Sequence, residues 1–168
     1  AEAGESCEGR TAADNMTDAQ GAEQLRLGNE IGAQIKELYD NLARIRDAKR
    51  QANELAAKTG AGSPIVVAAK TLKDRLEAVE ADMTHMQGDA GGQDALNFPG
   101  RMDNQLLVLF GSIINPERRM GTPVLERYRD IKPESDKLML RAAAALKTEV
   151  AAFNAVAAKA GLDPIVVK

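Results

Sequence analysis

The sequence predicts an all-α fold, an antiparallel helical bundle with about four main helices and a long coiled-coil-like αα-hairpin. Two observations carry this prediction. Ala, Leu, Glu, Lys and Arg are abundant in the 168 residues, whereas aromatic residues make up 3% and Trp is absent; such residues lose little rotamer freedom in a helix. Apolar residues also recur with the 4,3,4,3 spacing of a heptad seam. We expect a flexible tail over residues 1–17 and a single bundle domain over residues 18–168.

The first two helices are predicted to form the hairpin. The first begins at Asp18 as N-cap and ends near Lys58, before a short glycine loop. Its seam, with one polar interruption near Lys49, consists of Ile31, Ile35, Leu38, Leu42, Ile45, Ala52 and Leu55. The second begins with Ser63 as N-cap and Pro64 as the first helical residue. Its seam consists of Ile65, Ala69, Leu72, Leu76, Val79, Met83 and Met86.

The stretch LNFPGRMDNQLLVLFGSIINP predicts a third helix. One apolar stripe runs through Met102, Leu106, Leu109 and Ile113. Further apolar residues fall off that stripe, namely Leu107, Val108, Phe110 and Ile114. A helix that is apolar nearly all round is buried on more than one side. We therefore expect this helix to be the central element or the one that faces a partner.

The last helix is predicted to begin with Thr122 as N-cap and Pro123 at the first helical position. Its first seam is formed by Val124, Tyr128 and Ile131. Pro133 is expected to kink or break the helix. The seam is then expected to resume through Met139, Ala143, Leu146, Val150, Phe153, Ala157 and Ala160.

Two stretches of the chain nearly repeat one another, AAKTGAGSPIVV at residues 56–67 and AAKAGLDPIVV at residues 157–167. Each follows a long amphipathic helix, and each supplies a glycine and then a proline, the residues that end and start helices. We interpret the likeness as the same helix-ending and helix-starting signals used twice rather than as a duplicated binding element. Because no helix follows the second copy, its Ile165, Val166 and Val167 are candidates for a docking hook.

Charge and residue usage argue against several classes of function. The formal net charge of −3 gives no general attraction to nucleic acid or to an anionic membrane. The longest apolar run, residues 106–110, is far shorter than the roughly 20 residues of a membrane-spanning helix. Cys7 is the only cysteine, and the only histidine is far from it in sequence. Carboxylate pairs such as Glu77 and Glu80 are expected to be solvated neighbours on a helix surface, so the sequence does not predict an enzyme.

Two possible metal sites are better explained by ordinary packing and turns. Met83, His85, Met86 and Met102 offer soft ligands for Cu(I), but methionine at seam positions is normal core filling. Asp89 and Asp94 lie in GDAGGQD, which lacks the alternating oxygen ligands of an EF-hand loop and is better explained as a polar turn. No cofactor is predicted.

Three segments carry a family resemblance: LKDRLEAVEADM, GGQDALNFPGRMDNQLLVLFG and KTEVAAFNAVAAKAGLDPIVV. From about Ala22 onward the chain resembles the C-terminal helical region of secreted bacterial proteins with sortilin-like or BNR-repeat β-propellers, which are often labelled glycosyl-hydrolase-like. In that family the helical region follows the propeller and is not where hydrolysis is expected. This chain has no propeller repeats, so the resemblance implies a periplasmic or secreted setting without the hydrolase activity.

The function predicted from these observations is a non-catalytic module that docks onto and stabilises a larger bacterial protein assembly. One form of it is an extrinsic accessory subunit of a respiratory or photosynthetic membrane complex, attached to the membrane only through its partners. The alternatives are the detached helical domain of a propeller hydrolase, and a bundle that binds a metal or small molecule. The predicted partner contacts are Phe98, Arg101, Leu107, Phe110, Ile114, Arg118, Arg119, Ile165, Val166 and Val167.

Overall fold

The computed structural model describes residues 16–85, 100–114 and 120–167. Within these ranges the chain forms four α-helices and no strand. They are α1 (Asp18–Ala57), α2 (Pro64–Met83), α3 (Met102–Ile113) and α4 (Thr122–Lys159). The predicted all-α helical bundle is therefore confirmed.

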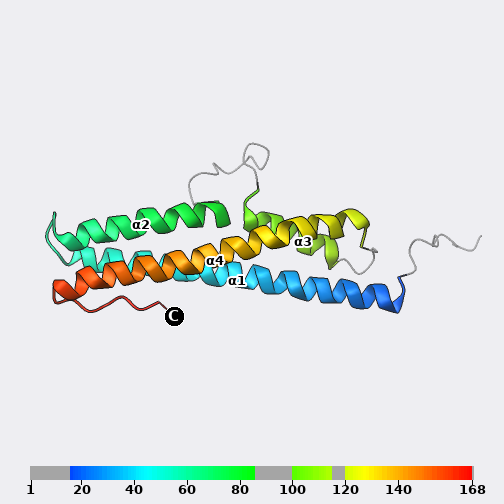
Figure 1. Ribbon diagram of the computed structural model, residues 1–168, viewed down its shortest axis with the longest axis horizontal. Coiled ribbons are helices and arrows are strands. Elements are labelled where there is room, and N and C mark those ends of the chain that lie inside the picture. The colour runs from blue at the N-terminus through cyan, green and yellow to red at the C-terminus, as the bar shows by residue number, and fades with distance from the viewer. Residues whose placement is uncertain (1–15, 86–99, 115–119, 168) are drawn as a thin grey trace, which may run out of the picture.

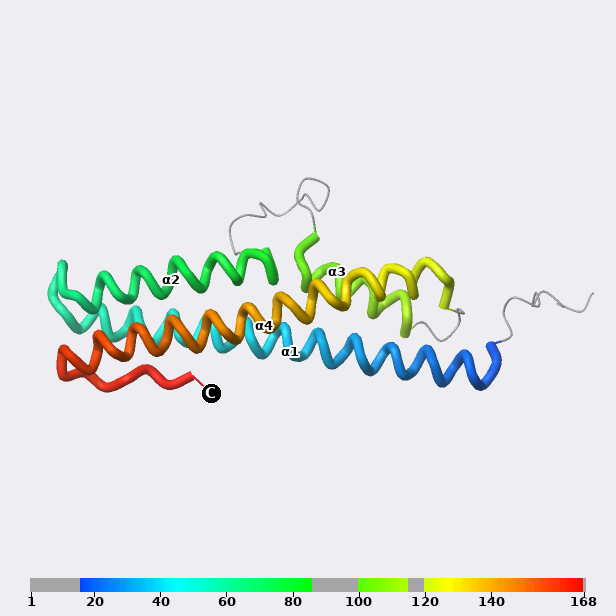
Figure 2. Tube along the Cα trace, in the orientation of Figure 1, coloured from blue at the N-terminus to red at the C-terminus, as the bar shows by residue number. Residues whose placement is uncertain are grey.

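The helices form an elongated rod (Figure 1). α1 and α4 run side by side in the same direction, and α2 and α3 follow one another along this pair in the opposite direction (Figures 1 and 2). At about 1.5 Å per residue, the 40 residues of α1 span about 60 Å. The Thr84 hydroxyl donates a hydrogen bond to Asp103 Oδ2 at 2.6 Å, which joins the end of α2 to the start of α3. The second arm of the hairpin is thus short, and α3 continues its course.

The core is one continuous apolar cluster along the rod. The predicted seams of α1 and α2 contribute a large part of it, and Ala48 fills the position where a polar interruption near Lys49 was expected. Small side chains at Ala48, Ala52 and Ala69 are buried, so neighbouring helices approach closely. Most of the core contacts are therefore aliphatic, with Phe153 and Tyr128 as its buried aromatic members.

Two predicted helix caps are wrong by one residue. α1 is capped by Thr17, whose side chain accepts from Gln20 N while the Gln20 side chain accepts from Thr17 N, a reciprocal capping box; Asp18 is already helical. α4 is capped by Gly121 without a side-chain hydrogen bond, and Thr122 is its first helical residue. The expected Ser63 cap of α2 is confirmed.

Of the kink or break expected at Pro133, the break is wrong, because α4 is continuous from Thr122 to Lys159. Pro133 itself is exposed, so the carbonyl left without an N–H donor one turn earlier lies toward solvent. Ser135 and Leu138 are buried and link Ile131 to the rest of the seam at heptad spacing. The predicted seam positions Ala143 and Ala160, by contrast, are exposed. Packing on both sides of the proline outweighs its local preference.

The two repeated stretches use their glycines differently. After α1, Ser63 N donates to Gly60 O, and Gly62 takes a φ of +85°, as a type II turn requires. After α4, Leu162 N donates to Ala157 O, and Gly161 has a φ of +70°, which is the Schellman arrangement. Gly60 and Gly161 occupy equivalent places in the repeat, but only Gly161 needs a left-handed backbone.

We therefore expect Gly161→Ala to lower the free energy of unfolding by about 1–2 kcal/mol, because a Cβ disfavours the left-handed conformation. Gly60→Ala serves as the matched control: its φ is not positive, and an added Cβ would meet nothing within 4 Å. Urea unfolding of both variants measures the difference. An equal loss in the two variants would contradict the distinct roles of the two glycines.

A buried carboxylate joins α1 to α2. The Glu80 side chain is 4% exposed and accepts from Arg46 Nε at 2.8 Å and from Lys49 Nζ at 2.6 Å. The expectation that Glu77 and Glu80 are solvated neighbours is thus wrong for Glu80. Burial raises the pKa of the Glu80 carboxyl group, but the hydrogen bonds from Lys49 and Arg46 outweigh burial and hold that pKa below its ordinary value.

Glu80→Gln is expected to lower the free energy of unfolding by about 2 kcal/mol at pH 7, since hydrogen bonds to a charged group are lost. A carboxyl group whose pKa is lowered by folding stabilises the fold fully when the pH is above its unfolded pKa of about 4.3. This stabilisation disappears as the pH falls through the pKa of the folded state. The difference in free energy of unfolding between Glu80→Gln and the unaltered chain should therefore shrink toward pH 3. Urea unfolding at both pH values measures it, with the more exposed Glu77→Gln as control; a difference independent of pH would contradict the assignment.

Candidate functional site

The outer face of α3 is the candidate functional site. The predicted stripe of α3 is confirmed, since Met102, Leu106, Leu109 and Ile113 are buried against the rod. The opposite face is open, because Leu107 is 45% exposed, Val108 63% and Ile114 52%. The expectation that α3 is the central element is therefore wrong, and the alternative, that it faces a partner, stays a prediction. Packing leaves an apolar surface, which we call the α3 outer face: the exposed Leu107, Val108 and Ile114 and the half-buried Phe110.

On the α1 side, the α3 outer face borders two glycines. A Cβ added at Gly32 would lie 3.6 Å from Phe110 Cε2, and one added at Gly28 would lie 3.6 Å from Ile114 Cγ2, which is ordinary van der Waals contact. Phe110 and Ile114 therefore lie next to α1 at these two positions. Leu25 lies one turn before Gly28 and is exposed, so we infer that the apolar surface extends from α3 onto α1.

On the α4 side, the α3 outer face borders a groove of about 570 Å³. Val108, Leu109, Val124 and Ile131 provide apolar walls. At the rim, Arg127 Nη2 donates to Gln105 Oε1 at 2.6 Å, and Gln105 Nε2 donates to Gly100 O at 2.9 Å. The groove thus combines apolar walls with a rim of polar groups that are already held in place.

The end of α3 is fixed by a side chain from α1. Gln24 is buried, and its Nε2 donates to the carbonyl oxygen of Ile113 at 2.5 Å. The last carbonyl groups of a helix have no partner within the helix, so Gln24 satisfies one that packing would otherwise bury unpaired. The α3 outer face is consequently presented by a helix that is anchored at both ends, by Gln24 and by the Thr84–Asp103 hydrogen bond.

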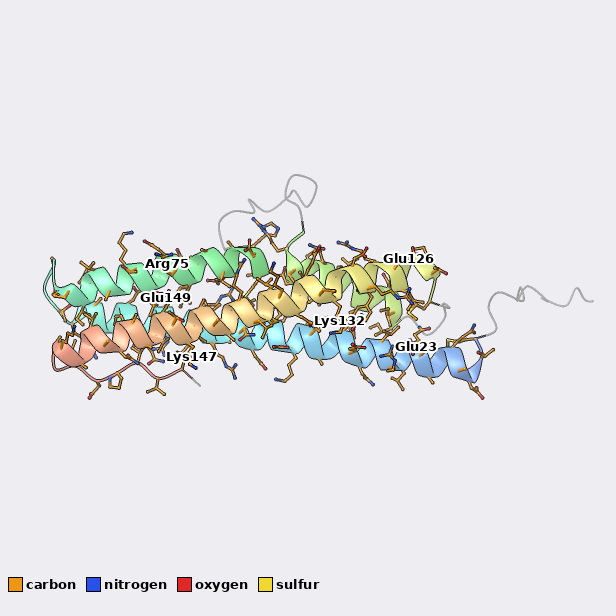
Figure 3. All side chains as sticks on the ribbon, in the orientation of Figure 1. Glu23, Arg75, Glu126, Lys132, Lys147 and Glu149 are labelled. Atoms are coloured by element: carbon orange, nitrogen blue, oxygen red, sulfur yellow. The ribbon has the colours of Figure 1, made fainter. Side chains whose placement is uncertain are left out.

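α3 differs from the other three helices in how few charged residues it carries. Charged side chains project from α1, α2 and α4, as the labelled Glu23, Arg75 and Lys147 illustrate (Figure 3). α3 carries one charged residue, Asp103, in its first turn. Exposed apolar patches rimmed by polar groups are typical of interaction sites, which makes the α3 outer face the candidate.

The other predicted contact residues do not gather at this surface. Phe98, Arg118 and Arg119 lie outside the described residues. Arg101 is half-buried at the N-cap of α3, where its Nε is buried without a hydrogen bond. At the C-terminal end Ile165 is part of the core, Val166 is exposed and Val167 is partly packed against the core. Ile165 is therefore not left over after packing, as the docking-hook hypothesis required.

Leu25, Val108 and Leu140 are among the exposed apolar residues that were not predicted as contacts. Each lies off the buried seam of its helix. Val108 is two residues after Leu106 and so lies about 200° around the helix from it, well away from the buried stripe. Helical-wheel positions relative to the α3 stripe would have identified Val108, but not its proximity to the groove beside α4.

The described residues offer little for metal chemistry. Met83 and Met102 are buried in the core and His85 is half-buried, while Met86, Asp89 and Asp94 lie outside the described ranges. Across residues 16–85, 100–114 and 120–167, no group of three or more His, Cys, Asp or Glu residues is placed to hold a metal ion. In the same ranges, no helix is both long and apolar enough to span a bilayer.

A comparison of the chain with protein-family models, curated proteins and solved structures finds no match. The resemblance to propeller-associated helical regions stays a prediction that depends on the residues quoted for it. Residues 92–99, which carry the most specific part of this resemblance, lie outside the described residues.

Proposed function

We propose that the chain is a non-catalytic interaction module that docks onto another protein subunit and stabilises a larger assembly. The observation that carries this proposal is the α3 outer face, an exposed apolar surface without a charged residue from Asn104 to Ile114. Its neighbouring groove has the chemistry that accepts the apolar face of a partner helix. The long rod beneath it supplies a rigid support, with α3 fixed at both ends.

For the setting, we propose a bacterial periplasm or the outer face of a membrane complex, where the module acts as an extrinsic accessory subunit. Its support is the family resemblance together with the net charge of −3, which favours attachment through protein partners over direct binding to anionic lipid. Cell fractionation of the source organism tests this setting. Recovery of the chain from the cytoplasm would contradict it.

The docking proposal is tested with a double variant, Leu107→Asp with Val108→Asp. Carboxylates at these positions should abolish an apolar interface while leaving the buried stripe of α3 intact. Leu140→Asp is the matched control, because Leu140 is an exposed leucine on α4. The readout is native mass spectrometry of material purified from source membranes, which detects a complex of defined stoichiometry.

The expected result is a complex with the unaltered chain and with Leu140→Asp, and none with the double variant. Circular dichroism and thermal unfolding should show that all three chains are folded. A complex retained by the double variant would show that the α3 outer face is not the docking surface. A chain that is monomeric in every preparation would contradict the proposed function as a whole.

A further inference from the structure

A pocket lies between α2 and α4 at the end of the rod where α2 begins (Figure 1). Its volume is about 500 Å³, and pockets that hold small molecules usually measure roughly 300–1,000 Å³. Leu72 and Phe153 line it from the core, where both are almost completely buried, and the exposed Val67 lies at its rim. We call it the α2–α4 pocket, and its walls are mainly apolar.

The α2–α4 pocket is open to solvent rather than filled by another part of the chain. Every residue that lines it belongs to residues 62–72 or 149–156, all of which the structure describes. The segment after α4 does not cross it, because residues 162–167 run along the α1 side of α4, where Val166 bonds to Gln51. A ligand can therefore reach the pocket without displacing a described segment.

The dimensions of the pocket favour a small molecule over a longer partner segment. At about 1.5 Å per residue, residues 64–72 of α2 and 149–156 of α4 give it walls about 10–12 Å long. On α2 the exposed apolar surface ends within this length, because Lys70 follows Val67 by one turn and is paired with Asp74. A molecule about as long as the walls can be enclosed by them, whereas a longer segment would leave the apolar surface.

The pocket contains one charged group. Glu149 is the only charged residue among the described residues that line it, and its side chain is half-buried on α4 (Figure 3). No other described residue donates a hydrogen bond to its carboxylate or forms an ion pair with it. This holds also for Arg75, an exposed residue of α2 about one turn after Leu72. The pocket therefore combines apolar walls with an unpaired carboxylate.

Glu149 differs in this respect from the other shielded carboxylates. Among the described residues, six acidic side chains are buried or half-buried: Glu30, Asp47, Glu77, Glu80, Asp103 and Glu149. All except Glu149 have a hydrogen bond or an ion pair. Removing a carboxylate partly from water costs free energy unless a cation or a hydrogen-bond donor lies near it. A bound cation would give Glu149 the kind of partner that the other five already have.

We propose that the α2–α4 pocket binds a small amphiphilic cation. The apolar body of this ligand lies against Leu72 and Phe153, and its protonated amine donates a hydrogen bond to the Glu149 carboxylate. Apolar contact supplies most of the affinity, and the charge decides which apolar molecules are accepted. The site is separate from the α3 outer face, which lies toward the other end of the rod (Figure 1), and it does not depend on the function proposed for that face.

The first experiment compares three compounds that share a phenyl ring and a butyl chain and differ in their terminal group. They are 4-phenylbutylamine, which is a cation, 4-phenylbutanol, which is uncharged, and 5-phenylpentanoate, which is an anion. Each is titrated into the full unaltered chain at about pH 7. NMR follows the methyl signals of Val67 and Val156 in the pocket and of Val108 on α3.

We expect 4-phenylbutylamine to shift the Val67 and Val156 signals to saturation with a Kd of about 1 mM or below. The alcohol should bind about fivefold more weakly, since it forms no ion pair. The carboxylate should bind more weakly still, since its charge repels that of Glu149. The Val108 signal should change little, because no carboxylate lines the groove beside α3.

The second experiment uses two variants, each with a matched control on α4. Glu149→Gln keeps the shape of the side chain without its charge and should weaken binding of the amine about fivefold while leaving the alcohol unchanged; Glu126→Gln, outside the pocket, should change neither. Ala152→Phe places a ring in the pocket and should weaken both compounds about tenfold or more. Ala155→Phe, at an exposed position that does not line the pocket, should not.

The absence of a saturable shift at Val67 and Val156 with the amine at about 10 mM would overturn the proposal. So would equal affinities of the amine and the alcohol, or an equal response of Val108, which would mean unspecific adsorption to apolar surface. Unchanged binding of the amine by Glu149→Gln or by Ala152→Phe would overturn it as well. The comparison of the three compounds needs no variant, so it decides even if a substituted chain does not fold.

Discussion

Replacing Phe153 with alanine is expected to lower the free energy of unfolding by about 3–5 kcal/mol, the usual cost of removing a buried phenylalanine. Phe153 is 2% exposed and is among the largest side chains that the core encloses. It also lines, with Leu72 and Val67, the junction of α2 and α4. Its removal would leave a space the size of a phenyl ring between α2 and α4, beside Leu72 and Val67.

Urea and thermal unfolding measure this loss. At about 2–4 °C per kcal/mol for a chain of this size, the unfolding midpoint should fall by roughly 6–20 °C. Leu140→Ala is the control, because its side chain is exposed and its removal should cost less than about 0.5 kcal/mol. A loss below about 1.5 kcal/mol at Phe153 would mean that α2 and α4 close around the empty space.

Apolar spacing was sufficient to predict the helices of this rod, because every seam must be buried against another helix. It could not predict how α4 passes Pro133, since the linking position is Ser135, a polar residue that is fully buried. A periodicity search counts such a residue as a break in the stripe. The same limit explains Glu80, whose burial depends on Lys49 and Arg46 from another helix.

Whether an apolar side chain is exposed or buried depends on which helices are neighbours. The spacing of residues within one helix does not contain that information. Leu107 and Ile114 were predicted as contacts from the excess of apolar residues on α3, and both are exposed. Ile165 was predicted as a contact because no helix follows the second Pro-Ile-Val-Val copy, yet it is buried, and hydrogen bonds with Asn154 hold its backbone against α4. Nothing in the sequence near either residue indicates that they pair.

Leu106→Ala is the second large change. Leu106 is fully buried in the middle of α3, and its truncation should cost about 2–5 kcal/mol. A helix of 12 residues has little stability of its own in water, so α3 remains helical only while its stripe is packed. We therefore expect this variant to release α3 locally rather than to unfold the whole rod.

Amide hydrogen exchange distinguishes local release from global unfolding. Protection within α3 should fall by about 30-fold or more, as a loss of 2 kcal/mol or more implies, while protection around Ile45 in the core of α1 should change little. Leu107→Ala removes the same atoms from the neighbouring, exposed position and should leave both unchanged. Equal effects of the two substitutions would contradict the assignment of buried and exposed faces.

Because α3 carries the proposed docking surface, Leu106→Ala should also weaken the complex without altering any residue of the α3 outer face. A complex of unchanged affinity would mean that the partner binds elsewhere on the rod.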